Sequence, residues 1–128
     1  MKVVIITGEK EVYSDQVDVI VVPGVEGELG ILPYHAPLMT SLQSGEIMTR
    51  KDGEETFLAV SGGFVEIMDN TVTILADSAE RSDDIDEQRA QAAMRRAQER
   101  IQQHPSDLDL ERAMATMRRS QVRLKVLR

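Results

Sequence analysis

The sequence predicts an α+β protein in which an antiparallel β-sandwich is followed by an antiparallel two-helix hairpin. Short β-branched runs separated by turn residues fill residues 1–82, and the apolar spacing becomes helical near residue 83. Charge divides the chain at the same point. Residues 1–82 carry fourteen acidic and five basic side chains, whereas residues 83–128 carry eight acidic and ten basic. We therefore expect two domains, residues 1–82 and 83–128, with different partners.

Composition excludes several kinds of protein. The chain has 128 residues, 41% of them hydrophobic, which is enough for a core, and it contains no cysteine for disulfides or thiolate chemistry. Its apolar runs are too short to cross a membrane, so no direct membrane insertion is expected. With no tryptophan and two phenylalanines, it has no evident aromatic platform for nucleic acid.

The first half shows strand patterns from its start. Residues 3–7 form a β-branched run, and residues 16–22 alternate around three valines before Pro23-Gly24 ends the pattern. Those three valines are Val17, Val19 and Val21. We expect two strands here.

Turn residues organise the rest of the sandwich. Residues 46–50 and 56–60 form a predicted hairpin, because the Asp52-Gly53 pair between them favours the positive φ angles of a tight turn. Ser61-Gly62-Gly63 is predicted to interrupt the strand pattern before residues 64–68. Asp69-Asn70 is predicted to turn the chain into a strand over residues 71–75.

The second half predicts two helices. The first has one apolar face and four acids in its predicted first turn, and His104-Pro105 is expected to end it. That face comprises Ala90, Ala93, Met94, Ala97 and Ile101, and the acids are Asp83, Asp84, Asp86 and Glu87. Ser106 and Asp109 resemble a capping box for the second helix. That helix is predicted to bury Leu110, Ala113, Met114, Met117, Leu124 and Leu127. Small residues on both faces bury little area, so the hairpin is expected to depend on a neighbour and to be able to leave it.

Four strings resemble the epsilon subunit of bacterial F-type ATP synthases in order and spacing. They are GELGILPYHAPLMTSLQSGEI, LAVSGGFVEI, NTVTILADSAER and DIDEQRAQAAMRRAQERI. The resemblance covers nearly the whole chain and implies a sandwich of about ten short strands. It also implies a non-catalytic subunit of the central stalk that binds gamma and the c ring. Its C-terminal helices would fold onto the sandwich or extend along gamma, where they restrain ATP hydrolysis.

The LGILPYHAPL loop contains one of only two histidines. One interpretation makes His35 a general base or metal ligand, with Glu28 as its partner. No second histidine, nucleophile or cluster with ligand spacing lies near it in sequence, so a surface or capping residue in a proline-rich turn is the simpler interpretation. The family resemblance implies a third: Glu28 and His35 face the polar loops of the c ring, and the loop is a contact surface.

The first predicted helix begins with IDEQRA, residues 85–90, which matches a motif that binds ATP in some bacterial epsilon subunits. The residues implied for nucleotide binding are Glu80, Ile85, Asp86, Arg89, Ala90 and Arg96. Asp86, Arg89 and Ala90 are spaced to share a helix face, so an arginine pair would hold phosphate oxygens while Asp86 accepts from the adenosine. An ordinary solvated helix shows the same charges, so both interpretations stay open. The second helix would add arginines, with candidates at Arg112, Arg118, Arg119 and Arg123.

The basic C-terminal segment also has several interpretations. It would suit anionic lipid, nucleic acid or an acidic protein surface, or it is a solvated helix end that complements the dipole. In the family such residues meet an acidic segment of the beta subunit when the hairpin is extended, which implies this inhibitory contact for Arg118, Arg119 and Arg123.

The leading functional hypothesis is a rotor and regulatory subunit of a proton-translocating ATP synthase. Its partners would be gamma, the c ring, and beta with alpha, at the cytoplasmic face of a bacterial membrane. We expect no catalytic site, no metal and no required cofactor, with ATP as a regulatory ligand. The alternative is a stand-alone nucleotide-binding sensor or adaptor with the same fold.

Overall fold

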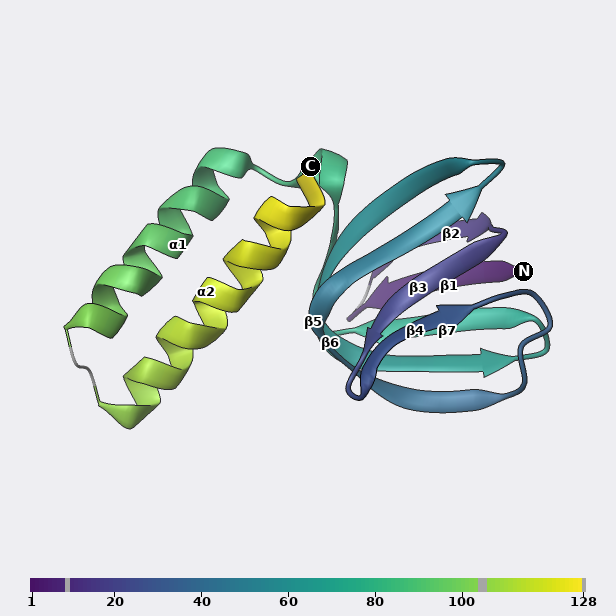
Figure 1. Cartoon of the computed structure of the whole chain (residues 1–128), viewed down its shortest axis with the longest axis horizontal. Coiled ribbons are helices and arrows are strands. Elements are labelled where there is room, and N and C mark those ends of the chain that lie inside the picture. The colour runs from purple at the N-terminus through teal and green to yellow at the C-terminus, as the bar shows by residue number, and fades with distance from the viewer. Residues whose placement is uncertain (9, 104–105, 128) are drawn as a thin grey trace.

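The computed structural model describes residues 1–8, 10–103 and 106–127. The predicted helix stop at His104-Pro105 lies outside these residues. The described chain forms eight strands: β1 (Lys2–Thr7), β2 (Lys10–Gln16), β3 (Val19–Gly24), β4 (Gly27–Ile31), β5 (Leu38–Lys51), β6 (Glu54–Met68), β7 (Thr71–Ala76) and β8 (Ala79–Arg81). A short 3-10 helix (Ser82–Asp84) then precedes α1 (Glu87–Gln102) and α2 (Asp107–Leu127). The predicted fold class, a sandwich followed by two helices, is confirmed (Figure 1).

The strands form one sheet that folds over into two layers. Their order is β2-β1-β7-β6-β5-β3-β4, and β8 pairs with β6. All pairs are antiparallel except β1 with β7, which is parallel. The predicted antiparallel sandwich thus contains one parallel pair.

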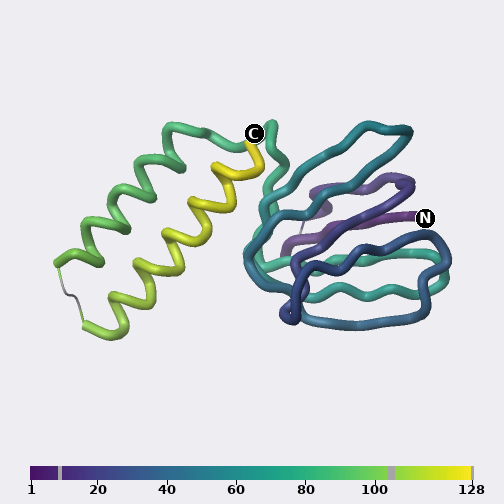
Figure 2. Tube along the Cα trace, viewed as in Figure 1, coloured from purple at the N-terminus to yellow at the C-terminus, as the bar shows by residue number. Residues whose placement is uncertain are grey.

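Two long strands serve both layers. β5 and β6 have 14 and 15 residues, and both bend as they pass from one layer to the other (Figure 2). Gly62 and Gly63 lie inside β6 with φ of 89° and 124°, so they bend the strand instead of ending it. The predicted interruption at Ser61-Gly62-Gly63 was wrong for this reason. The same bending explains why the described residues form eight strands instead of about ten.

The two predicted tight turns are present. Asp52 and Gly53 have φ of 51° and 83°, and they connect β5 to β6. Asp69 and Asn70 have φ of 51° and 57°, and they connect β6 to β7. Both pairs thus adopt the left-handed backbone that two-residue hairpins require.

The region before residue 38 differs from prediction. Residues 10–16 form β2, which was not predicted, and β3 begins only at Val19. In β3 Ile20 and Val22 are buried whereas Val19 and Val21 are only half-buried, so the predicted phase of the strand was wrong. The first part of the LGILPYHAPL segment is strand β4, which leaves residues 32–37 as the loop.

The core lies between the two layers of the sandwich. Its fully buried side chains are aliphatic and come from six strands: Val3, Ile5, Ile20, Val22, Ile31, Ile47, Leu58, Val65, Ile67, Val72 and Ile74. Between the layers, the hydroxyls of Tyr13 and Thr49 lie 3.2 Å apart in a buried hydrogen bond. This hydrogen bond satisfies polar groups that would otherwise be costly to bury.

The hairpin meets the sandwich through one end of α2. Figure 1 shows the C-terminal end of α2 beside the sheet, while the rest of the hairpin projects away. Val126 is 2% exposed, and Lys125 Nζ lies 3.5 Å from Glu46 Oε2 on β5. This small contact is consistent with a hairpin that depends on its neighbour.

The apolar faces of the hairpin differ in part from prediction. Ala90, Ala97 and Ala113 are buried as expected. On α2 the other buried residues are Ser120 and Val126, whereas the predicted Met114 is 40% exposed. Leu110, Met117, Leu124 and Leu127 are only half-buried. At the start of α2, Asp109 N donates to Ser106 Oγ at 3.4 Å, which gives one half of the predicted capping box.

Candidate functional site

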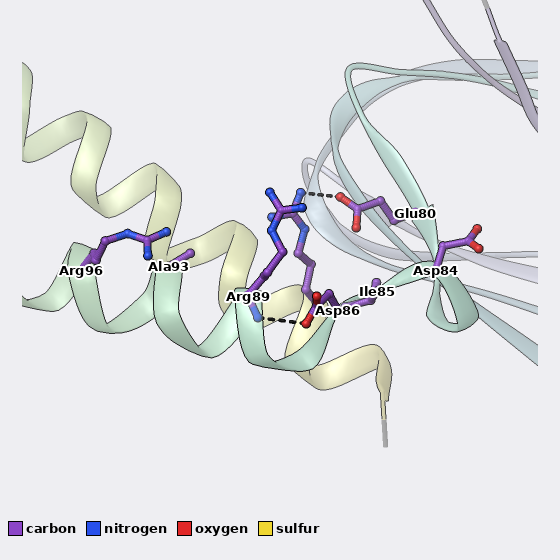
Figure 3. Close-up of a pocket in the computed structure, with 8 residues that line it drawn as sticks. Glu80, Asp84, Ile85, Asp86, Arg89, Ala93 and Arg96 are labelled. Atoms are coloured by element: carbon purple, nitrogen blue, oxygen red, sulfur yellow. Dashed lines mark hydrogen bonds and ion pairs between the residues drawn. The ribbon is translucent and has the colours of Figure 1, made fainter.

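A pocket of about 300 Å³ lies where the hairpin joins the sandwich (Figure 3). It draws side chains from β8, the 3-10 helix, the segment before α1, and both helices. The lining residues are Glu80, Asp84, Ile85, Asp86, Arg89, Ala93, Arg96 and Arg123. The structure thus brings together five of the six residues chosen from the sequence for nucleotide binding. Ala90, the sixth, does not line the pocket and is 3% exposed.

Asp86 is the N-cap of α1. Its backbone is extended, and Oδ1 accepts a hydrogen bond from Arg89 N at 3.1 Å. Only Glu87 is an acid in the first turn of α1, because Asp83 and Asp84 lie in the 3-10 helix. Asp86 therefore precedes the helix as its cap, and it lines the same pocket as Arg89. The cap fixes the start of α1 and with it the position of Arg89 over the pocket.

Arg123 joins the pocket from α2. Its Nη2 is hydrogen-bonded and ion-paired with Glu80 Oε1, and both side chains are one-third exposed. Local sequence spacing could not identify which α2 arginine faces α1, because that depends on the register of the two helices. The structure selects Arg123 from the four candidates. Arg112, Arg118 and Arg119 are exposed, and Arg119 Nη2 donates to Thr116 Oγ1 at 3.2 Å.

Charge is distributed unevenly along the pocket. Glu80 and Asp84 lie at the sandwich end, and Arg96 lies further along α1 (Figure 3). Arg89 lies between these ends, and Arg123 reaches the sandwich end, where it pairs with Glu80. A ligand with hydrogen-bond donors at one end and anionic oxygens at the other matches this arrangement, since guanidinium groups bind phosphate oxygens in a bidentate manner.

The 32–37 loop places His35 apart from this pocket. His35 Nδ1 donates to the neighbouring Ala36 carbonyl oxygen at 2.7 Å, and the ring is half-buried. Tyr34 has φ of 62°, and its backbone N donates to Asn70 Oδ1 at 2.8 Å, which ties the loop to the β6–β7 turn. Leu32 and Tyr34 are 62% and 85% exposed. The loop thus presents apolar surface to solvent.

Glu28 lies on β4 and lines a groove of about 270 Å³. Val21, Met48 and Phe57 also line it, and they form one row across β3, β5 and β6 because Met48 pairs with both others. Lys125 of α2 lines the same groove. Glu28 is therefore close to the docking end of the hairpin, whereas His35 lies beyond the opposite end of β4.

A third hollow, of about 430 Å³, lies at the β5–β6 turn and is lined by Tyr13, Asp15, Thr49, Lys51, Asp52, Glu54 and Thr56. Among residues 1–8, 10–103 and 106–127, no group of three or more His, Asp or Glu is arranged to hold a metal ion. In the same residues, neither helix is both long and apolar enough to cross a membrane.

Family models match the chain from end to end. Residues 1–82 match the beta-sandwich domain of the ATP synthase delta/epsilon chain, and residues 83–128 match the long alpha-helix domain of the same chain. The ATP synthase epsilon chain of Dehalococcoides mccartyi is 53% identical over 98 residues, which are 77% of this chain and 70% of that one. The epsilon chain of Pelotomaculum thermopropionicum is 50% identical over 97 residues, 76% of this chain and 72% of that one.

A solved structure shares the fold. A chain of the Euglena gracilis mitochondrial ATP synthase (OSCP/F1/c-ring) superposes with a TM-score of 0.85 at 20% identity, over 98% of this chain and 80% of that one. The fold and the sequence relatives thus define a subunit of an ATP synthase. The chain belongs to the ATP synthase delta/epsilon family, as one of its epsilon chains. The resemblance inferred from the four strings is confirmed.

Proposed function

We propose that this epsilon chain couples gamma to the c ring in the rotor of a proton-translocating ATP synthase and restrains ATP hydrolysis through its hairpin. It would act without a catalytic site of its own, as a peripheral subunit at the cytoplasmic face of a bacterial membrane. Membership of the epsilon family supports the rotor assignment. The exposed side chains of Leu32 and Tyr34 in the 32–37 loop support a contact surface for the c ring at that end of the sandwich.

ATP is the proposed regulatory ligand of the hairpin pocket. The observation that carries this proposal is that β8, α1 and α2 together contribute Glu80, Arg89 and Arg123 to one cavity. The adenosine would lie toward the acidic end, where carboxylates accept from its amine and hydroxyls. The phosphates would lie on Arg89, Arg96 and Arg123, and Arg123 would exchange Glu80 for a phosphate oxygen.

The pocket exists only while the hairpin is docked on the sandwich. ATP would therefore bind the docked state more tightly than the extended state and shift the population toward docking. The docked hairpin would not inhibit hydrolysis. This account makes the hairpin a nucleotide-responsive switch.

Inhibition would come from the extended hairpin through a contact with the beta subunit. Arg118 and Arg119 are exposed on α2 and are available to an acidic partner surface. Arg123 is engaged with Glu80 while the hairpin is docked, so extension would have to break that ion pair first. The same arginine would then serve the docked and the inhibitory state in turn.

Calorimetric titration of the full chain with ATP tests the pocket. Wild-type protein is expected to bind ATP saturably, and Arg89→Ala to weaken binding at least tenfold, because a charge-assisted hydrogen bond contributes about 1.5–3 kcal/mol. Arg95→Ala removes the same charge from an exposed position on α1 that does not line the pocket, and it should bind like wild type. Absence of saturable binding at millimolar ATP, or equal loss in both variants, would overturn the nucleotide site.

A further inference from the structure

The hairpin pocket, which Glu80, Arg89 and Arg123 line, is the first of two cavities at the hairpin. The second has a volume of about 90 Å³ and adjoins the first. It is lined by Ala93, Arg96, Ala97, Arg100, Ala113 and Thr116, so it lies between α1 and α2. Ala93 and Arg96 line both cavities. The two cavities are therefore neighbours along the hairpin, with Ala93 and Arg96 between them, and together we call them the interhelical groove.

Residue spacing explains why the groove continues. Arg89, Ala93, Arg96 and Arg100 follow one another at intervals of four, three and four residues, which places them on one face of α1. Thr116 lies seven residues before Arg123 on α2 and returns to nearly the same side. Alanines form the walls of the second cavity, and their small side chains leave space that larger residues would fill.

Charge changes along the interhelical groove. The first cavity contains the carboxylates of Glu80, Asp84 and Asp86, whereas the lining of the second contains two guanidinium groups, one hydroxyl and no carboxylate. The Thr116 hydroxyl already accepts from Arg119 Nη2, so its own proton is available to another acceptor. The polar side chains that line the second cavity therefore offer only hydrogen-bond donors, and a phosphate group binds to such donors.

The volume of the second cavity is suited to a small group. It exceeds several-fold the roughly 10–15 Å³ that a single water needs. It also lies on the Arg96 side of the first cavity, where the proposed ATP would direct its terminal phosphate. A longer phosphate chain would enter the second cavity without moving the adenosine.

We propose that the interhelical groove binds phosphate chains of four or more units, with the fourth phosphate on Arg96, Arg100 and Thr116. The preferred ligand is a nucleoside 5′-tetraphosphate or a related polyphosphorylated nucleotide. This inference rests on the proposed ATP site, because the first three phosphates occupy that site. The groove would then make the hairpin responsive to this class of nucleotide in addition to ATP.

Calorimetry of the full chain at fixed ionic strength tests the inference. The probes are ATP, adenosine 5′-tetraphosphate and inorganic tetraphosphate. Adenosine 5′-tetraphosphate is expected to bind about tenfold more tightly than ATP, the gain from one additional charge-assisted hydrogen bond. Inorganic tetraphosphate should bind more weakly than adenosine 5′-tetraphosphate, because it lacks the adenosine that occupies the acidic end of the first cavity.

Matched variants separate specific binding from general attraction of anions. Arg100→Gln and Thr116→Val should each reduce the tetraphosphate advantage and leave ATP affinity unchanged. Arg95→Gln removes one exposed charge from α1 outside both cavities and should keep the advantage. Equal affinity of wild type for the two nucleotides, or equal losses in Arg95→Gln and Arg100→Gln, would overturn the inference while leaving the ATP site intact. Failure of both nucleotides to bind would overturn the ATP site as well.

Discussion

Asp86 determines the geometry of the pocket through a single hydrogen bond. Its Oδ1 accepts from Arg89 N, so α1 begins at Glu87 and its first arginine extends over the pocket. The sequence motif identified both residues but assigned Asp86 to the helix face. N-caps and first-turn residues have nearly the same composition, and only the backbone angles distinguish them.

Asp15 and Lys51 form an exposed ion pair across the sandwich, with Nζ 2.9 Å from Oδ1. The Lys51 hydrogen bond, followed by that from Gln16 N, lowers the pKa of Asp15 below its ordinary value of 3.8. The same pair raises the pKa of Lys51 above 10.5. Because the folded pKa of Asp15 is lowered, its contribution to stability is present above the unfolded pKa and is lost as pH falls through the folded pKa. The contribution of Lys51 is lost as pH rises through its folded pKa.

We predict that Lys51→Met raises the pKa of Asp15 toward 3.8 without reaching it, because the Gln16 hydrogen bond remains. A pH titration of the Asp15 carboxyl carbon by NMR measures this value. Lys2→Met, at an exposed position of β1 outside this ion pair, is the matched control and should leave it unchanged. An unchanged Asp15 pKa in Lys51→Met would show that the pair does not persist in solution.

At the scale of elements, β6 depends on the backbone freedom of Gly63. A Cβ added there would lie 2.1 Å from the Leu75 carbonyl oxygen and 2.7 Å from Ala76 Cα, and the φ of 124° is strained for any L side chain. We predict that Gly63→Ala destabilises the sandwich by several kcal/mol, because β6 and β7 must move apart. Urea unfolding measures this loss, and Gly30→Ala, which meets no atom within 4 Å, is the control. Equal stability of the two variants would contradict the account.

Local sequence signals predicted the elements that local chemistry decides. The Asp52-Gly53 and Asp69-Asn70 turns follow from adjacent residue pairs, and the Ala90–Ala97 face of α1 follows from helical spacing. The bend within β6, the phase of β3 and the place of Arg123 depend on contacts between distant segments. For example, the pairing of β3 with β4 and β5 places Ile20 and Val22 in the core, so Val21, which lies between them, faces outward. Residues 19–22 are all apolar, so periodicity alone does not decide which of them face the core.

At the scale of the whole molecule, the hairpin and the sandwich share a small interface that contains the hairpin pocket. The Lys125–Glu46 pair and the Arg123–Glu80 pair connect the C-terminal end of α2 to the sheet, and Val126 in the same turn is buried. Each pair has at least one side chain that is one-third exposed or more, and ion pairs in contact with solvent typically contribute only about 0–1 kcal/mol. Docking therefore also needs buried apolar area. A contact of this size suits a switch, because modest ligand binding energy is sufficient to shift it.

The central claim is that the docked hairpin permits ATP hydrolysis and the extended hairpin restrains it. Because the chain has no cysteine, Glu46→Cys and Lys125→Cys introduce the only thiols in this subunit. A cleavable bismaleimide would join them in the assembled, otherwise cysteine-free synthase. A crosslink between cysteines at Arg50 and Glu55, both within the sheet, controls for the chemistry.

The decisive measurement is ATP hydrolysis by the crosslinked synthase before and after the crosslink is cleaved. The account predicts uninhibited hydrolysis while α2 is tethered to β5 and restored inhibition in the same sample after cleavage, with no change in the Arg50–Glu55 control. Inhibition that is equally strong in the tethered and the cleaved enzyme would contradict it.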